Sequence, residues 1–348
     1  MLGNLEAKES VPAQTARAPL QTNCAAPSLS VIITAHNYRA YIGEAIDSVL
    51  TQQPPALELI VIDDGSNDGT SSYVGDRYLG TPGLQLITQP NKGQLAAFHV
   101  GVSRARGDII AFLDADDLFE AGYLHRLTEI YQGYPEVDFV YADLSYFGQR
   151  QGPIRPPATS RAIGYSRLLG AYRHQWQGSP TSALSIRRHL ALEVLRLPED
   201  MHPQWRSRAD DCLILGSDIL GAYKYHLAEP LVRYRAHGSN AWLGESSSDY
   251  QNFLHWLRTQ NLLAIYQERS GLTLQRRGEA LRHAKCEFRT RPQPSLEELR
   301  HYSALVRQAD LPWNKQLEHR IALWRHFLSS RYRRAATARR SAARIAGT

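Results

Sequence analysis

The sequence predicts an α/β fold, in which a mostly parallel sheet is covered by helices on both faces. Short apolar runs alternate with segments of helical spacing between Ser28 and Asp117. These runs are almost continuously apolar, as is typical of parallel strands that are buried on both faces. Clusters of acidic residues directly follow two of the runs, and ligands of such sheets bind beyond the carboxyl ends of the strands.

The first half of the chain supplies the elements of this sheet in a regular order. We expect strands over Leu29–Ala35, Leu57–Asp63, Leu84–Gln89 and Asp108–Asp114. Helices are expected over Tyr41–Gln52, which Pro54 and Pro55 end, and over Gly93–Arg106, which Gly107 ends. The segment DDGSNDGT after the second strand is typical of a polar turn.

The second half is less regular. The alternation in VDFVYADLSYF, Val137–Phe147, indicates a further strand, and a proline-rich connector follows over Gly152–Pro157. From about Ser246 amphipathic helices predominate, and the spacing of Ser295 and Glu298 fits a capping box. A final helix is expected from about Trp313 into the basic C-terminus.

Composition and length define the broad organisation. The chain has 348 residues, 43% of them hydrophobic and 21% charged, which is ordinary for a globular protein. We expect a disordered tail over 1–27, an α/β domain over 28–245 and a C-terminal helical region with an arginine-rich tail over 246–348. The first 27 residues lack the apolar core of a signal peptide, and no run approaches the ~18 apolar residues that span a bilayer.

Two further features bear on location and partners. The cysteines, Cys24, Cys212 and Cys286, match no metal spacing, so we expect free thiols in a reducing, cytoplasmic compartment. No acidic residue follows Glu318, whereas eight arginines do; without them the formal net charge of +6 becomes −2. This concentration of charge argues for a local basic patch and against a nucleic-acid-binding core.

The acidic clusters carry the chemical prediction. Asp63 and Asp64 end one strand, and Asp114, Asp116 and Asp117 end another. One interpretation is a pair of solvated turns in which each Asp bonds its own backbone. Because both clusters are expected at one edge of the sheet, we favour a site for a divalent cation and a nucleotide diphosphate.

Five blocks of sequence, in order, make the chain resemble the family 2 glycosyltransferases of GT-A fold. They are VIITAHNYRAYIGEAIDSVLTQ, LIVIDDGSNDGT, NKGQLAAFHVGVSRARGDIIAFLDADD, ADD and EPLVRYRAHGSN, and they span roughly Ser28 to Asn240. The resemblance implies an inverting enzyme that uses a nucleotide-sugar donor, most often a UDP-sugar, with Mg²⁺ or Mn²⁺. It also implies a glycan or lipid-linked saccharide as acceptor, in the synthesis of cell-surface polysaccharide or glycoconjugate.

The resemblance assigns roles to individual residues of the donor site. Thr34 and Asp64 would contact the base and ribose, with Asp63 beside them. Asp114 and Asp116 match the DxD motif, in which the first acid faces the nucleotide and the second the metal; Asp117 is the alternative metal ligand. His237 matches a late histidine that approaches the diphosphate or metal.

The catalytic base is expected in the block ADD, where Asp211 matches the acid that deprotonates the acceptor hydroxyl. Asp210 stands where the family commonly has Glu. One catalytic carboxylate fits direct displacement with inversion, whereas a glycoside hydrolase uses two. A pair of acids at a helix N-terminus is the structural alternative for this block.

Several other residues have less specific signals. Lys92, Arg233 and Arg235 are candidates for neutralising a diphosphate, although each also reads as an ordinary surface charge. Trp176 either stacks on a sugar ring of the acceptor or lies in the core.

Two interpretations of the C-terminal region stay open. In one, a helical lid packs its apolar side on the domain, which would account for most of its aromatic residues: Trp242, Phe253, Trp256, Trp313, Trp324 and Phe327. In the other, the helix from Trp324 and its arginine-rich tail lie on an anionic membrane surface, which would make the protein peripheral at the inner face of the cell membrane.

Two other functions are compatible with parts of the sequence. A nucleotidyltransferase also binds nucleotide and metal on an α/β sheet, but TAHNYRA after the first strand lacks the glycines of a phosphate loop. A catalytically silent nucleotide-binding scaffold is the second alternative, and the intact acids at all three blocks argue against it.

Overall fold

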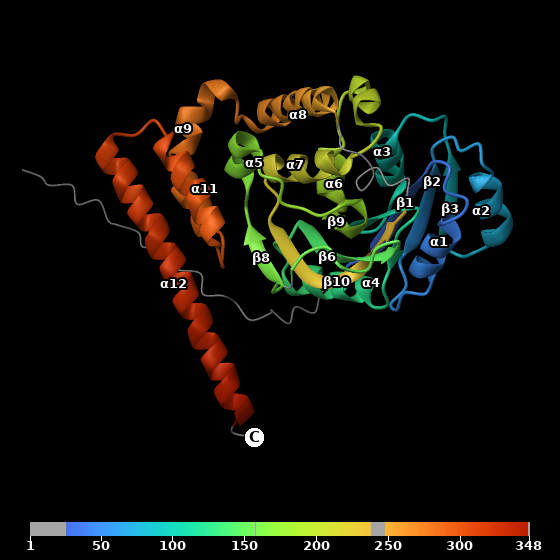
Figure 1. Ribbon diagram of the computed structural model, residues 1–348, viewed down its shortest axis with the longest axis horizontal. Helices are drawn as coiled ribbons and strands as arrows, with labels where there is room; N and C mark the ends of the chain where they lie inside the picture. Colours follow the sequence, from blue (N-terminus) through green and yellow to red (C-terminus); the bar gives the residue numbers. More distant parts are fainter. Residues whose placement is uncertain (1–25, 157, 238–247, 347–348) are drawn as a thin grey trace, which may run out of the picture.

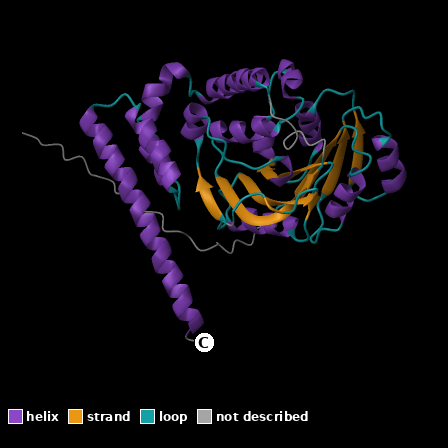
Figure 2. Cartoon of the chain, in the orientation of Figure 1, coloured by secondary structure: helices purple, strands orange, loops and turns teal. Residues whose placement is uncertain are grey.

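The structure is a computed structural model that describes residues 26–156, 158–237 and 248–346, with side chains as far as residue 333. Its strands form one sheet (Figure 2). The order of the strands in this sheet is β3-β2-β1-β4-β9-β6-β10-β5. Their bounds, in sheet order, are β3 Leu84–Thr88, β2 Glu58–Asp63, β1 Leu29–Ala35, β4 Ile109–Asp114, β9 Leu184–Arg187, β6 Phe139–Gly148, β10 Lys224–Ala236 and β5 Leu118–Phe119. Two short strands, β7 (Gly152–Pro153) and β8 (Arg161–Gly164), pair with β6 and β10.

The first four long strands are mutually parallel, as the sequence predicts. Strand β9 runs antiparallel between β4 and β6. Strand β10, which carries His237 just beyond its end, is parallel to β6. The mixed sheet flanked by helices confirms the predicted α/β fold class.

Alternate residues of the strands supply two separate hydrophobic cores. In β1, Val31 and Ile33 belong to the core beneath α1 (Ile42–Leu50), α2 (Thr70–Tyr78) and α4 (Tyr123–Gly133). Ile32 belongs to the core beneath α3 (Gln94–Arg104), α6 (Arg188–Val194) and α7 (Asp210–Leu220), on the other face (Figure 1). Because six of the seven residues of β1 are buried, its sequence is mainly apolar.

The register of the strands brings the acidic clusters to one edge of the sheet. Thr34 of β1 is paired with Asp114 of β4, and its neighbour Ala35 is paired with Asp63 of β2. The carboxyl ends of three neighbouring strands therefore meet at one place, as the sequence predicts.

The C-terminal helices extend the second core. These helices are α8 (Asp249–Ser270), α9 (Arg277–Leu281), α10 (Ala284–Arg289), α11 (Leu296–Arg307) and α12 (Trp313–Ala346). Helix α5 (Arg167–Arg173) contacts α9, α10 and α11. Leu262, Leu263 and Tyr266 of α8 lie in the same core as Ile32. The capping box at Ser295 and Glu298 is confirmed.

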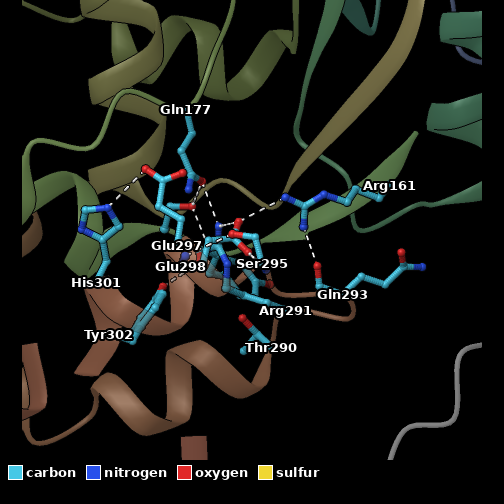
Figure 3. A network of polar contacts seen from close by, with 12 residues as sticks. Arg161, Gln177, Thr290, Arg291, Gln293, Ser295, Glu297, Glu298, His301 and Tyr302 are labelled. Carbon is cyan, nitrogen blue, oxygen red and sulfur yellow. Dashed lines mark hydrogen bonds and ion pairs between the residues drawn. The ribbon is translucent and has the colours of Figure 1, made fainter. Parts of the chain in front are cut away.

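A buried charged network joins these helices to the α/β part (Figure 3). The guanidinium of Arg291 is fully buried and donates to Glu298 at 2.8 Å. It also donates to the Tyr165 carbonyl at 2.7 Å and to Gln177 at 3.1 Å. Arg161 of β8 approaches the same Glu298 carboxylate at 3.3 Å. The C-terminal helices are thus attached through polar groups as well as through the core.

The lid interpretation of the C-terminal aromatics is wrong for most of them. Phe327 is buried, but Phe253, Trp256, Trp313 and Trp324 are exposed. Trp242 lies outside the described residues, as do the tail over 1–25 and the side chains beyond residue 333. Among the described helices, none combines the length and apolar character that crossing a bilayer requires.

Candidate active site

The acidic turn after β4 gives each of its three carboxylates a different environment. Asp117 is fully buried; its Oδ2 accepts a hydrogen bond from the Ser182 hydroxyl at 2.5 Å and its Oδ1 accepts one from the Arg235 amide at 2.8 Å. Burial, together with Asp116 and Asp114, raises the pKa of Asp117 well above its usual range. Asp117 therefore joins the turn to η1 (Thr181–Ala183) and to β10.

Asp116 faces the end of β10. Its Oδ2 lies 2.8 Å from Nε2 of His237, whose ring stacks on Tyr41 with centroids 5.1 Å apart. Arg235 donates to the Asp116 carbonyl at 2.8 Å, and its guanidinium lies 4.9 Å from the Tyr41 ring centroid. It also pairs with Glu44 at 2.9 Å. The sequence block that contains Arg235 and His237 therefore contacts the DxD turn at Asp116.

Asp114 is connected to the second acidic block through a residue that sequence reasoning missed. The Gln94 amide donates to Asp114 Oδ1 at 3.1 Å, and its oxygen accepts from the Ala209 amide at 3.0 Å. The pKa of Asp114 is raised well above its usual range by burial, and next by the negative charges of Asp116 and Asp210. A single Gln at the start of a helix carries no sequence signal of this role.

The first acidic pair holds two loops in place. Both oxygens of Asp63 accept hydrogen bonds, Oδ1 from Ser66 in the following turn and Oδ2 from Ser71 at the start of α2. Asp64 accepts from the backbone amides of Lys92 at 2.8 Å and Gly93 at 2.7 Å. Asp64 also accepts from the Gln89 side chain at 2.7 Å.

The remaining donor-site candidates border this arrangement. Thr34 is half-buried beside Asp114 in the sheet, and the Lys92 side chain is exposed. Arg233 pairs with Glu120 at 3.4 Å and lies 4.6 Å from the Phe147 ring centroid, so its charge is already balanced.

Asp211, the predicted base, lies in the first turn of α7 and is almost fully buried. Its Oδ1 accepts a hydrogen bond from the Trp176 indole at 2.8 Å, whereas its Oδ2 has no hydrogen-bond partner. Arg208 and His255 lie 3.5 and 3.7 Å from that second oxygen. Trp176 is 38% exposed, so it is not a core residue.

Burial is the main influence on the protonation of this pair of acids. Burial raises the pKa of Asp211, although the charge of Arg208 and the Trp176 hydrogen bond lower it. For Asp210, burial and then the Asp211 charge raise the pKa to about 7. A carboxylate in this environment is more basic than one in water, which suits proton abstraction near neutral pH.

Helix α8 contributes to the site from far along the sequence. The Arg258 guanidinium donates to Nδ1 of His255 at 3.0 Å and lies 4.6 Å from the Trp205 ring centroid. Burial and the charges of Arg208 and Arg258 lower the pKa of His255 to about 4, so the ring is neutral at pH 7. Sequence reasoning missed both residues, because a histidine in an amphipathic helix has no distinguishing pattern.

The metal ligands that the described side chains offer are few. The described residues contain no group of three or more His, Cys, Asp or Glu side chains arranged to hold a metal ion. Asp116 and His237 form a pair, as noted above. Cys212 and Cys286 are free thiols, and Cys24 lies outside the described residues.

Comparison with known sequences identifies relatives of the chain. The family described as glycosyl transferase family 2 matches residues 30–194. An uncharacterized glycosyltransferase of Nostoc sp. is 33% identical over 226 residues, which are 63% of this chain and 68% of that protein. A chondroitin synthase of Pasteurella multocida is 36% identical over 94 residues, which are 27% of this chain but only 10% of the synthase.

Comparison with solved structures agrees on the fold. TarS of S. aureus, residues 1–349 in complex with UDP-GlcNAc, superposes with a TM-score of 0.52 at 16% identity, covering 88% of this chain and 92% of that one. The arrangement of the sheet, the acidic residues at its edge and the matched relatives all indicate the same family. The chain belongs to the family 2 glycosyltransferases and has their GT-A fold.

Proposed function

We propose that the protein is an inverting, metal-dependent glycosyltransferase that moves a sugar from a UDP-sugar to a hydroxyl group of a glycan or lipid-linked saccharide. The observation that carries the proposal is the environment of Asp211. One oxygen of this buried carboxylate is held by Trp176 and the other has no hydrogen-bond partner. Gln94 connects the start of the same helix to Asp114 at the DxD turn.

The residues around the DxD turn would bind the donor. Thr34, Asp64 and Asp114 line the end of the sheet and would contact the nucleoside, with Lys92 near the phosphates. The UDP-GlcNAc complex of the structurally similar TarS supports a UDP-sugar as donor.

The residues also fit a divalent cation. Mg²⁺ and Mn²⁺ often take one or two protein ligands and complete their coordination with phosphates and water. Asp116 and His237 offer one carboxylate oxygen and one ring nitrogen at 2.8 Å from each other. Asp116 is a better ligand than Asp117, because both oxygens of Asp117 already accept hydrogen bonds. When bound, the cation would neutralise the departing diphosphate.

The chemical step needs one base. Asp211 Oδ2 takes the proton of the acceptor hydroxyl while the hydroxyl oxygen bonds to the anomeric carbon. The bond from that carbon to the diphosphate breaks with its electron pair, so the configuration is inverted in a single displacement. General base catalysis of this kind contributes roughly 10²–10⁴-fold.

The class of acceptor is inferred from the relatives. The matched chondroitin synthase makes a polysaccharide, according to its name, although the match covers a small part of it. A glycan acceptor also fits the indole of Trp176, which is partly exposed beside the proposed base. We therefore propose a role in extending a polysaccharide or glycoconjugate.

The test is donor turnover. The protein is incubated with Mn²⁺ and a panel of nucleotide sugars, with and without acceptor extracts, and release of free nucleoside diphosphate is measured. We expect release from a UDP-sugar, and a loss of at least about 10²-fold in Asp211→Asn with donor affinity retained.

The exposed Asp200 in η2 (Glu199–Trp205) provides the control, since Asp200→Asn changes the same chemical group at an exposed position outside α7. If no donor is turned over, the enzymatic proposal is wrong. If Asp211→Asn also abolishes donor binding, the residue binds donor or metal and is not the base.

A further inference from the structure

Helix α12 has an exposed apolar stripe along one side. The side chains are 46–78% exposed and follow one another at intervals of three or four positions: Trp313 77%, Leu317 48%, Ile321 53%, Trp324 46%, Leu328 58% and Tyr332 78%. With 3.6 residues per turn, this spacing places all six within an arc of about 100°. We call these six residues the α12 stripe.

The α12 stripe is not the side by which the helix packs on the protein. Leu323 and Phe327 are buried in the second core, and α12 contacts α10 and α11. Nε2 of His326 donates a hydrogen bond to the Arg291 carbonyl oxygen at 2.9 Å on that packed side. The C-terminal part of α12 projects beyond the rest of the molecule (Figure 1). The helix therefore already has its partner in the fold, and the stripe faces outward.

The charges beside the stripe are all of one sign in its C-terminal part. Arg320, Arg325 and Arg331 lie next to it along the helix, and no acidic residue follows Glu318. Long basic side chains beside an apolar strip can extend to anionic headgroups while their stems stay in the apolar region. Trp and Tyr are favoured at the same depth, because their rings are apolar and carry one polar atom.

We propose that the α12 stripe docks on an anionic lipid surface, with the helix lying in the plane of the interface. This surface is distinct from the donor site and does not depend on the proposed reaction. It also differs from a purely electrostatic attraction of the arginine-rich tail, because the described apolar side chains would enter the boundary of headgroups and acyl chains.

A second copy of the chain fits the stripe less well. Helices that pair through an apolar seam usually place opposite charges beside it. Two α12 helices side by side would bring Arg320, Arg325 and Arg331 of both copies together without acidic partners in this part of the helix. An anionic surface balances these charges, whereas a second copy adds to them.

The proposal is tested by flotation with lipid vesicles. The wild-type protein is expected to float with vesicles of phosphatidylcholine and phosphatidylglycerol, and much less with phosphatidylcholine alone. Trp324→Ser combined with Leu328→Ser should lower the partition coefficient by about tenfold or more, since two exposed apolar groups are removed. Arg325→Gln combined with Arg331→Gln should lower it only with the anionic vesicles.

Matched controls come from apolar residues that are as exposed elsewhere. Leu79 and Leu274 are 89% and 67% exposed and lie outside α12, so Leu79→Ser and Leu274→Ser should leave flotation unchanged. Thermal unfolding of the stripe variants should stay close to that of the wild type, because Trp324 and Leu328 are 46% and 58% exposed and Trp324 meets the core only at the edge of the Phe327 ring. Vesicles that contain brominated lipid should quench tryptophan fluorescence, and less so in Trp313→Phe combined with Trp324→Phe.

Two results would overturn the proposal. If the serine variants float as well as the wild type, the stripe does not contact lipid. If sedimentation shows that the wild type is a dimer and the serine variants are monomers, and neither protein binds vesicles, the stripe is an interface between two copies. Both results leave the donor turnover test unaffected, so they are distinguishable from failure of the proposed function.

Discussion

At the level of single residues, the acidic turn after β4 distributes its charge among separate partners. Asp117 is held by Ser182 and the Arg235 amide, Asp116 lies against His237, and Asp114 is held by Gln94. Like charges so close together would otherwise destabilise the turn. Gln94 belongs to α3, Ser182 to η1, and Arg235 and His237 to β10 and the residue that follows it, so the acids also fix the relative positions of these three elements.

Trp176 should tune the proposed base. Trp176→Phe removes the hydrogen bond to Asp211 Oδ1, which lowers the pKa of Asp211 in the wild type. The pKa of Asp211 should therefore rise further in the variant. We expect turnover to fall and the acid limb of its pH profile to move to higher pH, with donor affinity unchanged.

Trp256→Phe is the control for this prediction, because the Trp256 indole lies on the exposed side of α8 and stacks on Phe253. It should leave the pH profile in place. An unchanged acid limb in Trp176→Phe would mean that the indole does not influence the base.

Asp210 should make stability depend on pH. Its pKa is raised from 3.8 to about 7 by burial first and then by Asp211, so between these values the folded state keeps a proton that the unfolded state releases. The contribution of Asp210 to the free energy of unfolding therefore falls as the pH rises from about 4 to about 7.

Asp210→Asn should remove this contribution. In EDTA, the variant should be more stable than the wild type by a few kcal/mol at pH 8 and close to it at pH 4, measured by urea unfolding at both pH values. An equal difference in stability at both pH values would contradict the raised pKa.

At the level of elements, the position of α8 against α7 decides where His255 lies relative to Asp211. Gly216 of α7 permits this close approach: a Cβ there would lie 2.6 Å from Tyr266 Cζ and 2.9 Å from Val194 Cγ1. We expect Gly216→Ala to destabilise the protein by about 1–3 kcal/mol through overpacking, measured by urea unfolding.

Gly75 provides the matched control for Gly216. It also lies within a helix, α2, but a Cβ there would meet nothing within 4 Å. Gly75→Ala should be neutral or stabilise by up to about 1 kcal/mol, because alanine loses less backbone entropy on folding. Equal effects of the two substitutions would show that α7 and α8 adjust to each other without strain.

The elements of the sheet could be predicted because burial on both faces leaves a mainly apolar run, as in β1, β2 and β4. The strand Leu29–Ala35 agrees with the structure at both ends. The meeting of Asp63 and Asp114 at one edge also followed from parallel strands. Gln94, His255 and the Trp176–Asp211 hydrogen bond could not be predicted, because each depends on a tertiary contact between distant segments. The outward orientation of Trp313 and Trp324 stayed undecided for the same reason: helical spacing does not say which of two apolar sides meets the core.

At the level of the whole molecule, the C-terminal helices and the α/β part share one core and one buried charged network. The network centres on Arg291, whose guanidinium contacts Glu298 of α11 and groups near α5 (Figure 3). Burial raises the pKa of Glu298, but the charges of Arg291 and Arg161 outweigh it and hold this pKa at about 2. Glu298 is therefore ionised, and its buried negative charge is balanced by Arg291 and Arg161.

Removing one member of this network should destabilise the protein far more than removing an exposed ion pair. Arg291→Met leaves the buried Glu298 carboxylate with the Ser295 amide and the more distant Arg161, which we expect to lower the free energy of unfolding by about 3–5 kcal/mol. Arg282→Met is the matched control: its pair with Asp310 is 47% and 76% exposed, and its loss should change stability by less than about 1 kcal/mol. Adding Glu298→Gln to Arg291→Met removes the unbalanced charge, so the double variant should be less destabilised than the sum of the single ones. Urea unfolding of all four variants measures these differences. Strict additivity would show that Arg291 and Glu298 contribute independently, and that the helices are attached by the apolar core alone.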